Sequence, residues 1–305
     1  MRVAHDVVLG SRKAVKFALF GALGGGVGSL ITEVVSNHRS SSSIVLMLWV
    51  GLWFGIIALT TATAINFAQL RYLKDKASIG EAVRSIAGFG FASGFVAGAV
   101  AQGSYTTIGP TEPWRIVCWG IAGALLGCAL SFRIPNLSRL RAAAGGGLGG
   151  VLGGCLFILV SWTFSEVIGR LLGVASIGFA IGMMLAVVES VFRNAWLDVK
   201  YGPRETKTVL LGREPVTLGS DTARCTVYAP GALPIALTFV VKQGQIECKD
   251  HASGRSTIVQ GGAQIAAGRA TVYVRESKHN KRLEPNAARD TAATPAVAEW
   301  WKDYT

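Results

Sequence analysis

Residues 44–68 read IVLMLWVGLWFGIIALTTATAINFA and contain no charged side chain. A helix needs about 20 predominantly apolar residues to cross the hydrocarbon core of a bilayer, so this stretch is long enough to span one. Comparable stretches precede and follow it, and together they predict an α-helical membrane bundle of six transmembrane helices. The six stretches are residues 14–36, 44–68, 85–105, 114–132, 142–163 and 171–192.

The chain has parts of unlike composition. Of its 305 residues, 50% are hydrophobic, 38 are glycine and only 16% are charged, but these figures average an apolar part and a polar part. We expect a six-helix transmembrane domain over residues 1–194 and a small β domain over 195–276. Residues 277–305 are polar and rich in Ala, Asn, Asp and Pro, which predicts a disordered tail ending near the pair Trp300-Trp301.

Basic residues gather at alternate ends of the expected helices. The positive-inside rule then places both termini in the cytoplasm and predicts a multi-pass protein of the plasma or inner membrane. This topogenic role explains the net charge of +12 better than a nucleic-acid-binding surface, so we expect no nucleic-acid partner. The basic clusters are Arg12, Lys13 and Lys16; Arg71, Lys74, Lys76 and Arg84; Arg133, Arg139 and Arg141; and Arg193.

Glycines recur about every fourth residue along most of the expected helices. Small residues at this spacing lie on one face and let helix backbones approach closely, as in a glycine zipper. The pattern also predicts three similar Gly-rich hairpins, an internal repeat that is degenerate in its first copy. We interpret the glycines as packing surfaces that could also join copies into a homo-oligomer, with a pore lining as the alternative. Clear sets are Gly88, Gly90, Gly94 and Gly98, and Gly145, Gly149 and Gly153.

Ionisable residues of the expected helices lie near helix ends. A charge at the bilayer centre costs at least about 2.5–3.5 kcal/mol, whereas one near an end can extend to the headgroups. We expect that behaviour here, with a pairing of Glu33 or Glu166 with Arg115 or Arg170 on the outer side as an alternative. Paired carboxylates at mid-span are missing, which argues against a coupled transporter. The residues concerned are Glu33, Arg115, Glu166, Arg170 and Glu189.

After residue 195 the pattern changes to short runs rich in β-branched residues with turn residues between them. Many short strands at this spacing indicate an antiparallel sandwich. No flexible linker separates the last helix from Trp196, which either starts the first strand or lies at the headgroups, so the β domain should stay close to the bilayer. The expected strands are residues 196–199, 208–211, 216–218, 226–228, 237–241, 245–248, 257–259, 264–265 and 271–274.

Residues 250–261, DHASGRSTIVQG, follow without a gap the line D-x-x-S-x-N-G-T-x-V-N-G of the forkhead-associated (FHA) domain family. Residues 215–220 resemble the family's strand that ends in a Gly-Arg pair. The resemblance covers residues 196 to about 276. It implies an all-β FHA-like sandwich, a fold that in its usual form binds phosphothreonine peptides.

The positions that match the family's phosphate-contacting residues have changed. Ser220 stands for the arginine, Pro234 and Leu237 stand for a serine and a histidine, and Arg255 stands for an asparagine. Because the charge-assisted hydrogen bonds to a phosphate are lost, we do not expect a standard phosphothreonine binder. The arginines of the loop face still favour cytoplasmic proteins with acidic or phosphorylated segments. The candidate binding residues are Ser220, Arg224, Ser253, Arg255 and Ser256.

Motifs of enzymes and cofactor sites are missing from the sequence, including G-x-S-x-G, a Walker-type loop and H-E-x-x-H. The five cysteines lack metal-ligand spacing, and the four histidines are scattered without evident partners. We therefore expect no enzymatic activity, cofactor or metal. Three function classes remain. The first is a membrane-anchored scaffold for a signalling or secretion assembly, and the second is a channel or permease with the β domain as its regulatory cap. The third is a chaperone-like or assembly factor of a larger membrane complex.

Overall fold

The computed structural model describes residues 2–35, 42–74, 77–109, 111–164, 166–202 and 205–277. The expected tail beyond Ser277, with Trp300-Trp301, lies outside these residues. The membrane part forms six helices, each long and apolar enough to span a bilayer. They are α1 (Arg2–Val35), α2 (Ser43–Lys74), α3 (Ile79–Ile108), α4 (Glu112–Ser131), α5 (Arg139–Thr163) and α6 (Glu166–Val191).

Two of the helices begin at serines that cap them. The Ser78 hydroxyl accepts a hydrogen bond from the Glu81 backbone N–H at 3.1 Å at the start of α3, and Ser138 does the same for Arg141 at 3.4 Å at the start of α5. Such caps satisfy backbone donors that have no partner within the helix. Both helices therefore start where a polar loop at the β-domain end meets an apolar run.

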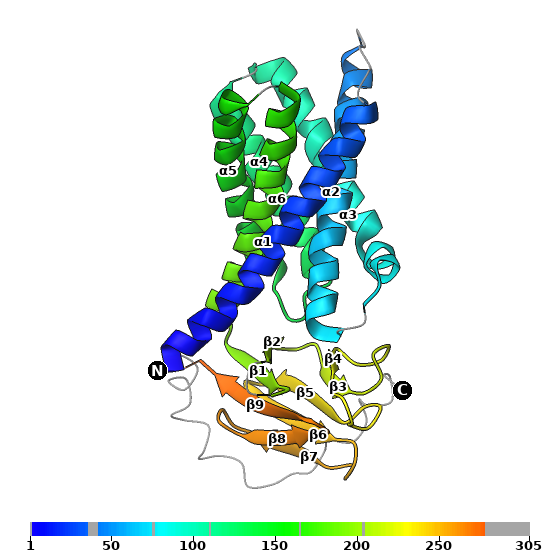
Figure 1. The fold of residues 1–305 in the computed structure, drawn as a ribbon, viewed down its shortest axis with the longest axis vertical. Helices are drawn as coiled ribbons and strands as arrows, with labels where there is room; N and C mark the ends of the chain where they lie inside the picture. The colour runs from blue at the N-terminus through cyan, green and yellow to red at the C-terminus, as the bar shows by residue number, and fades with distance from the viewer. Residues whose placement is uncertain are drawn as a thin grey trace.

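Each helix packs against its neighbours in the chain, and α1 packs against α6, so the six helices form a closed bundle (Figure 1). The pairs α2–α3, α1–α6, α5–α6 and α4–α5 share extensive contacts, whereas α3 and α4 share fewer. The expected hairpin repeat would pair α3 with α4. The three-hairpin repeat therefore stays a prediction.

Glycines lie where helix backbones come closest. A Cβ atom added to Gly21 of α1 would collide with the carbonyl oxygen of Gly178 of α6, and the reverse is also true. Gly123 of α4 and Gly146 of α5 face each other in the same way. In lipid the hydrophobic effect does not drive helices together, so close backbone packing has to supply the attraction.

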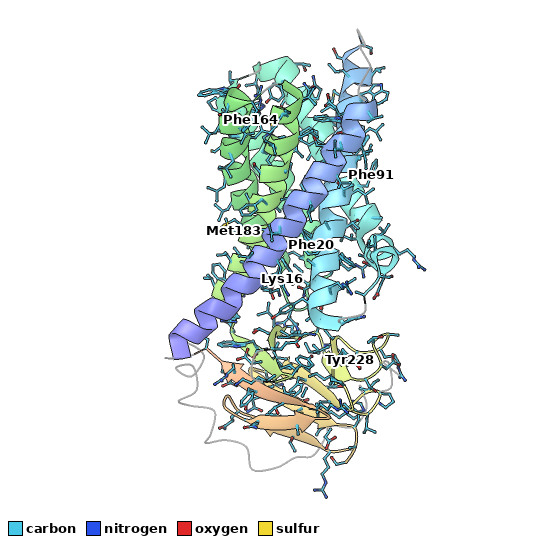
Figure 2. The ribbon with its side chains drawn as sticks, in the orientation of Figure 1. Lys16, Phe20, Phe91, Phe164, Met183 and Tyr228 are labelled. Carbon is cyan, nitrogen blue, oxygen red and sulfur yellow. The ribbon has the colours of Figure 1, made fainter. Side chains whose placement is uncertain are left out.

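Large apolar side chains point outward around the bundle, as the sticks in Figure 2 show. Leu23 is 63% exposed and Trp162 is 80% exposed. An apolar surface of this extent is unfavourable in water and suits contact with lipid. In the same view Phe164 lies at the end of the bundle away from the sheets, and Tyr228 lies at the junction with them.

The part after α6 is a β domain of two sheets, with strand orders β2-β1-β9-β8 and β4-β3-β5-β6-β7. Every strand expected from the sequence is present. One expectation was wrong: β3 and β4 are parallel, with Leu218 opposite Val227, so the sheets are not wholly antiparallel. The strands are β1 (Ala195–Lys200), β2 (Thr206–Leu211), β3 (Val216–Gly219), β4 (Val227–Tyr228), β5 (Leu237–Lys242), β6 (Gln245–Asp250), β7 (Ser256–Val259), β8 (Gln264–Ala267) and β9 (Ala270–Glu276).

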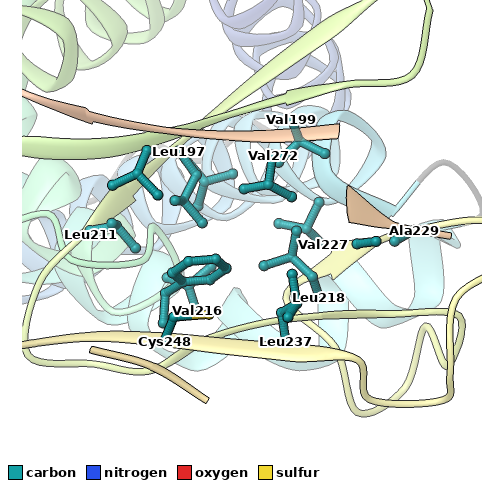
Figure 3. Packing of buried hydrophobic residues seen from close by; sticks show 14 of the residues in the cluster. Leu197, Val199, Leu211, Val216, Leu218, Val227, Ala229, Leu237, Cys248 and Val272 are labelled. Carbon is teal, nitrogen blue, oxygen red and sulfur yellow. The ribbon is translucent and has the colours of Figure 1, made fainter. Parts of the chain in front are cut away.

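The two sheets share one apolar core (Figure 3). Leu197 and Val272 come from the first sheet, and Leu218 and Phe239 come from the second; all four are fully buried. Burying such side chains contributes about 1.5–3 kcal/mol each. Leu73, from the end of α2, belongs to the same cluster, so the core extends to the membrane helices.

The link between the two parts is short. Helix α6 ends at Val191 and β1 begins at Ala195. Trp196 lies in β1, as one of the two alternatives predicted, and the Arg193 guanidinium lies 4.5 Å from its ring. The sheets therefore follow directly below the helix ends (Figure 1).

Candidate functional site

One end of the five-stranded sheet carries most of the candidate binding residues. The register places Leu218 of β3 opposite Leu237 of β5, and Leu237 opposite Asp250 of β6. One end of the sheet therefore brings together four strand termini: the end of β3, the start of β5, the end of β6 and the start of β7. Ser220 and the β6–β7 turn lie at this end of the sheet, which we call the loop end.

The β6–β7 turn is held by Asp250. Its carboxylate accepts hydrogen bonds from the Ala252 backbone N–H and from the Ser253 hydroxyl, both at 2.9 Å. These hydrogen bonds lower the pKa of Asp250, and the bond from the Ala252 N–H has the largest effect. Gly254 has a φ of +69°, a conformation that glycine adopts readily. Part of the motif that resembles the FHA family thus has a structural role, closing this turn.

Three candidate residues remain exposed on that turn: Ser253, Arg255 and Ser256. The Arg255 carbonyl accepts a hydrogen bond from the Asp250 N–H at 2.9 Å, which fixes the backbone while the side chain stays outside. The turn therefore exposes one positive charge and two hydroxyl groups on its surface.

The other two candidates lie on the β3–β4 loop. The Ser220 N–H donates to the Leu233 carbonyl at 3.0 Å, and the Arg224 carbonyl accepts from the Thr217 hydroxyl at 3.2 Å. Arg224 is exposed and Ser220 is half-buried. Because β3 and β7 are three strand spacings apart, about 14 Å, the candidate residues form two groups and not one cluster.

The remaining positions that match phosphate-contacting residues of the FHA family serve the fold. Leu237 is buried in the core, and the Pro234 carbonyl accepts hydrogen bonds from the Asp221 N–H at 3.2 Å and from the Cys225 thiol at 3.1 Å. Burial raises the pKa of the Cys225 thiol. A side chain able to contact a phosphate is therefore missing at both positions.

His251 has a partner that the sequence did not reveal. Its Nε2 atom lies 3.0 Å from the Thr238 hydroxyl, and its backbone N–H donates to the Ala236 carbonyl at 2.9 Å. Partial desolvation lowers the pKa of the imidazole, although the residue is exposed, and the nearby Lys249 lowers it further. The expectation of a histidine without partners was wrong here, because two adjacent strands bring Thr238 and His251 together.

Asn136, between α4 and α5, joins the membrane helices to the β domain. Its amide donates to the carbonyls of Leu210 at 3.2 Å and Glu214 at 3.1 Å, while its Oδ1 atom accepts from the Glu214 N–H at 2.9 Å. The residue has a φ of +58°, which asparagine tolerates better than most residues. Sequence reasoning missed this contact, because a Pro-Asn pair such as Pro135-Asn136 indicates a turn at most and does not identify what the asparagine binds.

A second contact between the two parts involves Tyr72 at the end of α2. Its hydroxyl accepts a hydrogen bond from the Thr208 N–H of β2 at 2.7 Å. The Lys13 ammonium lies 5.1 Å from the centre of the Tyr72 ring and 2.5 Å from the Glu189 carboxylate. Lys13 and Glu189 are both buried, so the expectation that Glu189 reaches the headgroups was wrong.

Charges at the far end of the bundle also pair. The Arg170 guanidinium holds the Glu33 carboxylate with two nitrogens, at 2.6 and 3.2 Å. One of the predicted alternatives is thereby confirmed. Arg115 instead pairs with Glu112 of its own helix at 3.1 Å, and the Glu166 side chain lies outside the described residues.

Aromatic rings fill the middle of the bundle. Phe54 stacks on Trp119 with ring centres 4.8 Å apart, and Phe157 lies 6.0 Å from Trp119. A small central cavity of about 30 Å³ beneath them is lined by apolar side chains and Thr61. This lining differs from the continuous Ser, Thr and Asn path that a pore would need.

Comparisons of the chain with protein-family models, with curated protein sequences and with solved structures gave no match. The FHA resemblance therefore stays a prediction carried by the residues quoted above. Within the described ranges, no group of three or more His, Cys, Asp or Glu side chains could hold a metal ion.

Proposed function

We propose that this integral membrane protein presents a degenerate FHA-like sandwich to the cytoplasm as a protein-interaction module. The observation that carries the proposal is the pair of contacts at Asn136 and Tyr72, which attach the β domain to the helices while Arg224 and Arg255 stay exposed. A domain held close to a bilayer with a free loop end suits the docking of a partner.

The cytoplasmic orientation is supported by the charges next to the sheets. The helix ends on this side carry Lys74, Arg139, Arg141 and Arg193, and the sheets lie at the same end of the bundle (Figure 1). Since basic residues stay on the cytoplasmic side, the β domain would lie in the cytoplasm with them.

The chemistry of the partner follows from the loop end. Arg255 at the loop end and Arg224, beside Thr217 on the β3–β4 loop, offer positive charge. Ser220, Pro234 and Leu237 supply no donor set for a phosphate dianion. We therefore propose an acidic segment of a cytoplasmic protein, bound without strict dependence on phosphothreonine. A scaffold in a signalling or secretion assembly would work in this way.

In this proposal the glycine faces act as glycine zippers that hold helices of one chain together. Gly21 and Gly178 already meet each other, so a homo-oligomer would have to use other surfaces. We also propose that the Gly-rich hairpins are three copies of one internal repeat, degenerate in the first copy.

A photo-crosslinking residue at Ser253 of the full-length protein in cells tests the interaction face. We expect one discrete protein adduct, and we expect it to disappear when Arg224 and Arg255 are both replaced by glutamate. The control position is Gln243, exposed in the β5–β6 turn at the opposite end of the sheet. Equal crosslinking from positions 253 and 243, or an adduct that survives the glutamate substitutions, would contradict the proposal.

The channel or permease reading predicts ion or solute flux through the purified protein in vesicles. The aromatic cluster of Phe54, Trp119 and Phe157 at mid-bundle gives it no support. We expect no flux above that of protein-free vesicles. Saturable flux would favour the alternative, with the β domain as its cap.

A further inference from the structure

A cavity of about 580 Å³ lies among α2, α3, α4 and α5, in the half of the bundle away from the β domain. Pockets that bind small molecules enclose about 300–1,000 Å³. The cavity combines an apolar floor with a polar rim, and neither part is used by the proposed interaction face. The cavity is therefore a candidate binding site separate from that face, within the membrane helices.

The floor consists of three aromatic rings. Phe54 of α2, Trp119 of α4 and Phe157 of α5 all line the cavity, and Trp119 touches the other two rings. Ala101 of α3 also lines the cavity and is 7% exposed. A surface of rings without charge suits a hydrocarbon chain.

The rim carries Gln102, Tyr105 and Arg115. The Arg115 guanidinium pairs with Glu112 at 3.1 Å and also interacts with the Tyr105 hydroxyl. A guanidinium has five N–H donors, so these two partners leave donors for a further anion. Because the Arg115 side chain is 39% exposed, a ligand headgroup can reach it from the cavity mouth.

The depth of the cavity matches one leaflet. Trp119 lies about 10 Å along α4 from the helix start at Glu112, at 1.5 Å per residue. Half of the hydrocarbon core of a bilayer is about 15 Å thick. A charge at Arg115 would thus sit near the headgroup level while the rings lie among acyl chains.

We propose that this cavity binds an amphiphile with one long hydrocarbon chain inside it and an anionic headgroup, a carboxylate or a phosphate ester, at Arg115. The chain lies against Phe54, Trp119 and Phe157. A fatty acid and an anionic phospholipid share this chemistry, and the test distinguishes them.

The test uses the full-length protein with two photoreactive probes: a diazirine analogue of palmitic acid, and phosphatidylglycerol with a diazirine in one chain. Labelled peptides are mapped by mass spectrometry. We expect labels on the cavity walls, around Ala101 and Trp119, removed by excess unlabelled palmitic acid or phosphatidylglycerol. Labelling by the free acid alone assigns a fatty acid, and labelling by the phospholipid assigns a membrane lipid. Walls left unlabelled by both probes would overturn the proposal.

Two matched variants separate the cavity from the lipid-facing surface. Ala101→Trp fills the cavity, whereas Val100→Trp adds the same side chain at a neighbouring position that is 58% exposed. We expect at least tenfold less labelling of the walls in Ala101→Trp and no change in Val100→Trp. Equal labelling of the two variants, when both elute alike in gel filtration, would overturn the proposal. If a variant misfolds, the competition experiment on the unaltered chain tests the proposal in its place.

The role of Arg115 in binding an anionic headgroup is tested by comparing a fatty acid with the matching uncharged alcohol. Arg115→Gln should weaken binding of the palmitic acid probe about tenfold, since hydrogen bonds to charged groups are among the stronger ones. The variant should bind the matching long-chain alcohol as the unaltered protein does. Arg115→Lys should restore most of the affinity for the acid. Equal affinity of Arg115→Gln for acid and alcohol, both unchanged, would remove Arg115 from the site.

Discussion

The Lys13 ammonium lies 2.5 Å from the Glu189 carboxylate and joins the first membrane helix to the last. Both side chains are buried at the end of the bundle that meets the β domain. Among the described residues, the second carboxylate oxygen of Glu189 has no hydrogen-bond partner. Lys13 is therefore the main compensation for a charge that would otherwise be isolated.

Glu189→Gln should destabilise the protein by about 3–5 kcal/mol, because it leaves the Lys13 ammonium buried without its counter-charge. Thermal unfolding in detergent measures the effect. The double change Lys13→Met with Glu189→Leu should recover much of the loss, since an apolar pair needs no compensation. The control is Glu33→Gln at the more exposed pair with Arg170, where we expect a smaller effect. Equal melting temperatures for Glu189→Gln and the unaltered chain would contradict this account.

Asn136→Gly keeps the backbone conformation of the loop but removes three hydrogen bonds to β2 and the residues after it. We expect the amides of residues 206–214 to exchange hydrogen faster, corresponding to about 1–3 kcal/mol of lost protection. The amides of β5, in the core of the other sheet, serve as an internal control. Unchanged exchange over residues 206–214 would show that Asn136 does not hold the junction.

Gly123→Ala should severely destabilise the bundle, because the new Cβ atom meets the backbone of Gly146 on α5. Gly88→Ala is the matched change in open space and should be neutral or stabilising by up to about 1 kcal/mol through helix propensity. Thermal unfolding of the two variants in the same detergent makes the comparison. Similar melting temperatures would mean that α4 and α5 are not packed backbone to backbone.

The β6–β7 turn should lose stability as the pH falls. Partial desolvation and the nearby Lys249 lower the pKa of His251, so the unfolded chain takes up a proton more readily than the folded one. Above about pH 6.5, the pKa of histidine in the unfolded chain, the imidazole is neutral in both states and does not affect stability. Below that pH the unfolded chain is protonated first, and the free energy of unfolding decreases. Asp250 adds a loss at lower pH, because its pKa is lowered in the fold.

Thermal unfolding at about pH 7.5 and pH 5.5 measures this difference. His251→Gln should shrink it, since the amide can still contact Thr238 and does not titrate. The charged groups that face the imidazole are Lys249 and Asp250. An unaltered chain that melts at the same temperature at both pH values would rule out a titrating His251.

The two parts of the fold could be predicted because their patterns are local. The uncharged run at residues 44–68 and the β-branched run at 237–241 each identify an element without knowledge of its neighbours. The parallel pairing of β3 and β4 could not be predicted, since the short runs at 216–218 and 226–228 carry no signal of direction. Alternation predicts a strand and not its partner.

The junction was missed for a related reason. Asn136 and Tyr72 bind backbone groups that lie 74 and 136 positions away in the chain. Only the tertiary fold brings those groups into reach. The candidate site could be predicted in part, since the β6–β7 turn follows a motif, but the separation of Arg224 from Arg255 depends on the order of strands in the sheet.

Accessibility from the two sides of the membrane tests the central claim, a β domain at the cytoplasmic end of six membrane helices. In a cysteine-free background, Thr107→Cys at the far end of α3 and Ser253→Cys at the loop end each provide one exposed thiol. A maleimide that cannot cross membranes should label position 107 in intact cells and position 253 only after permeabilisation. Labelling of position 253 in intact cells would contradict the account.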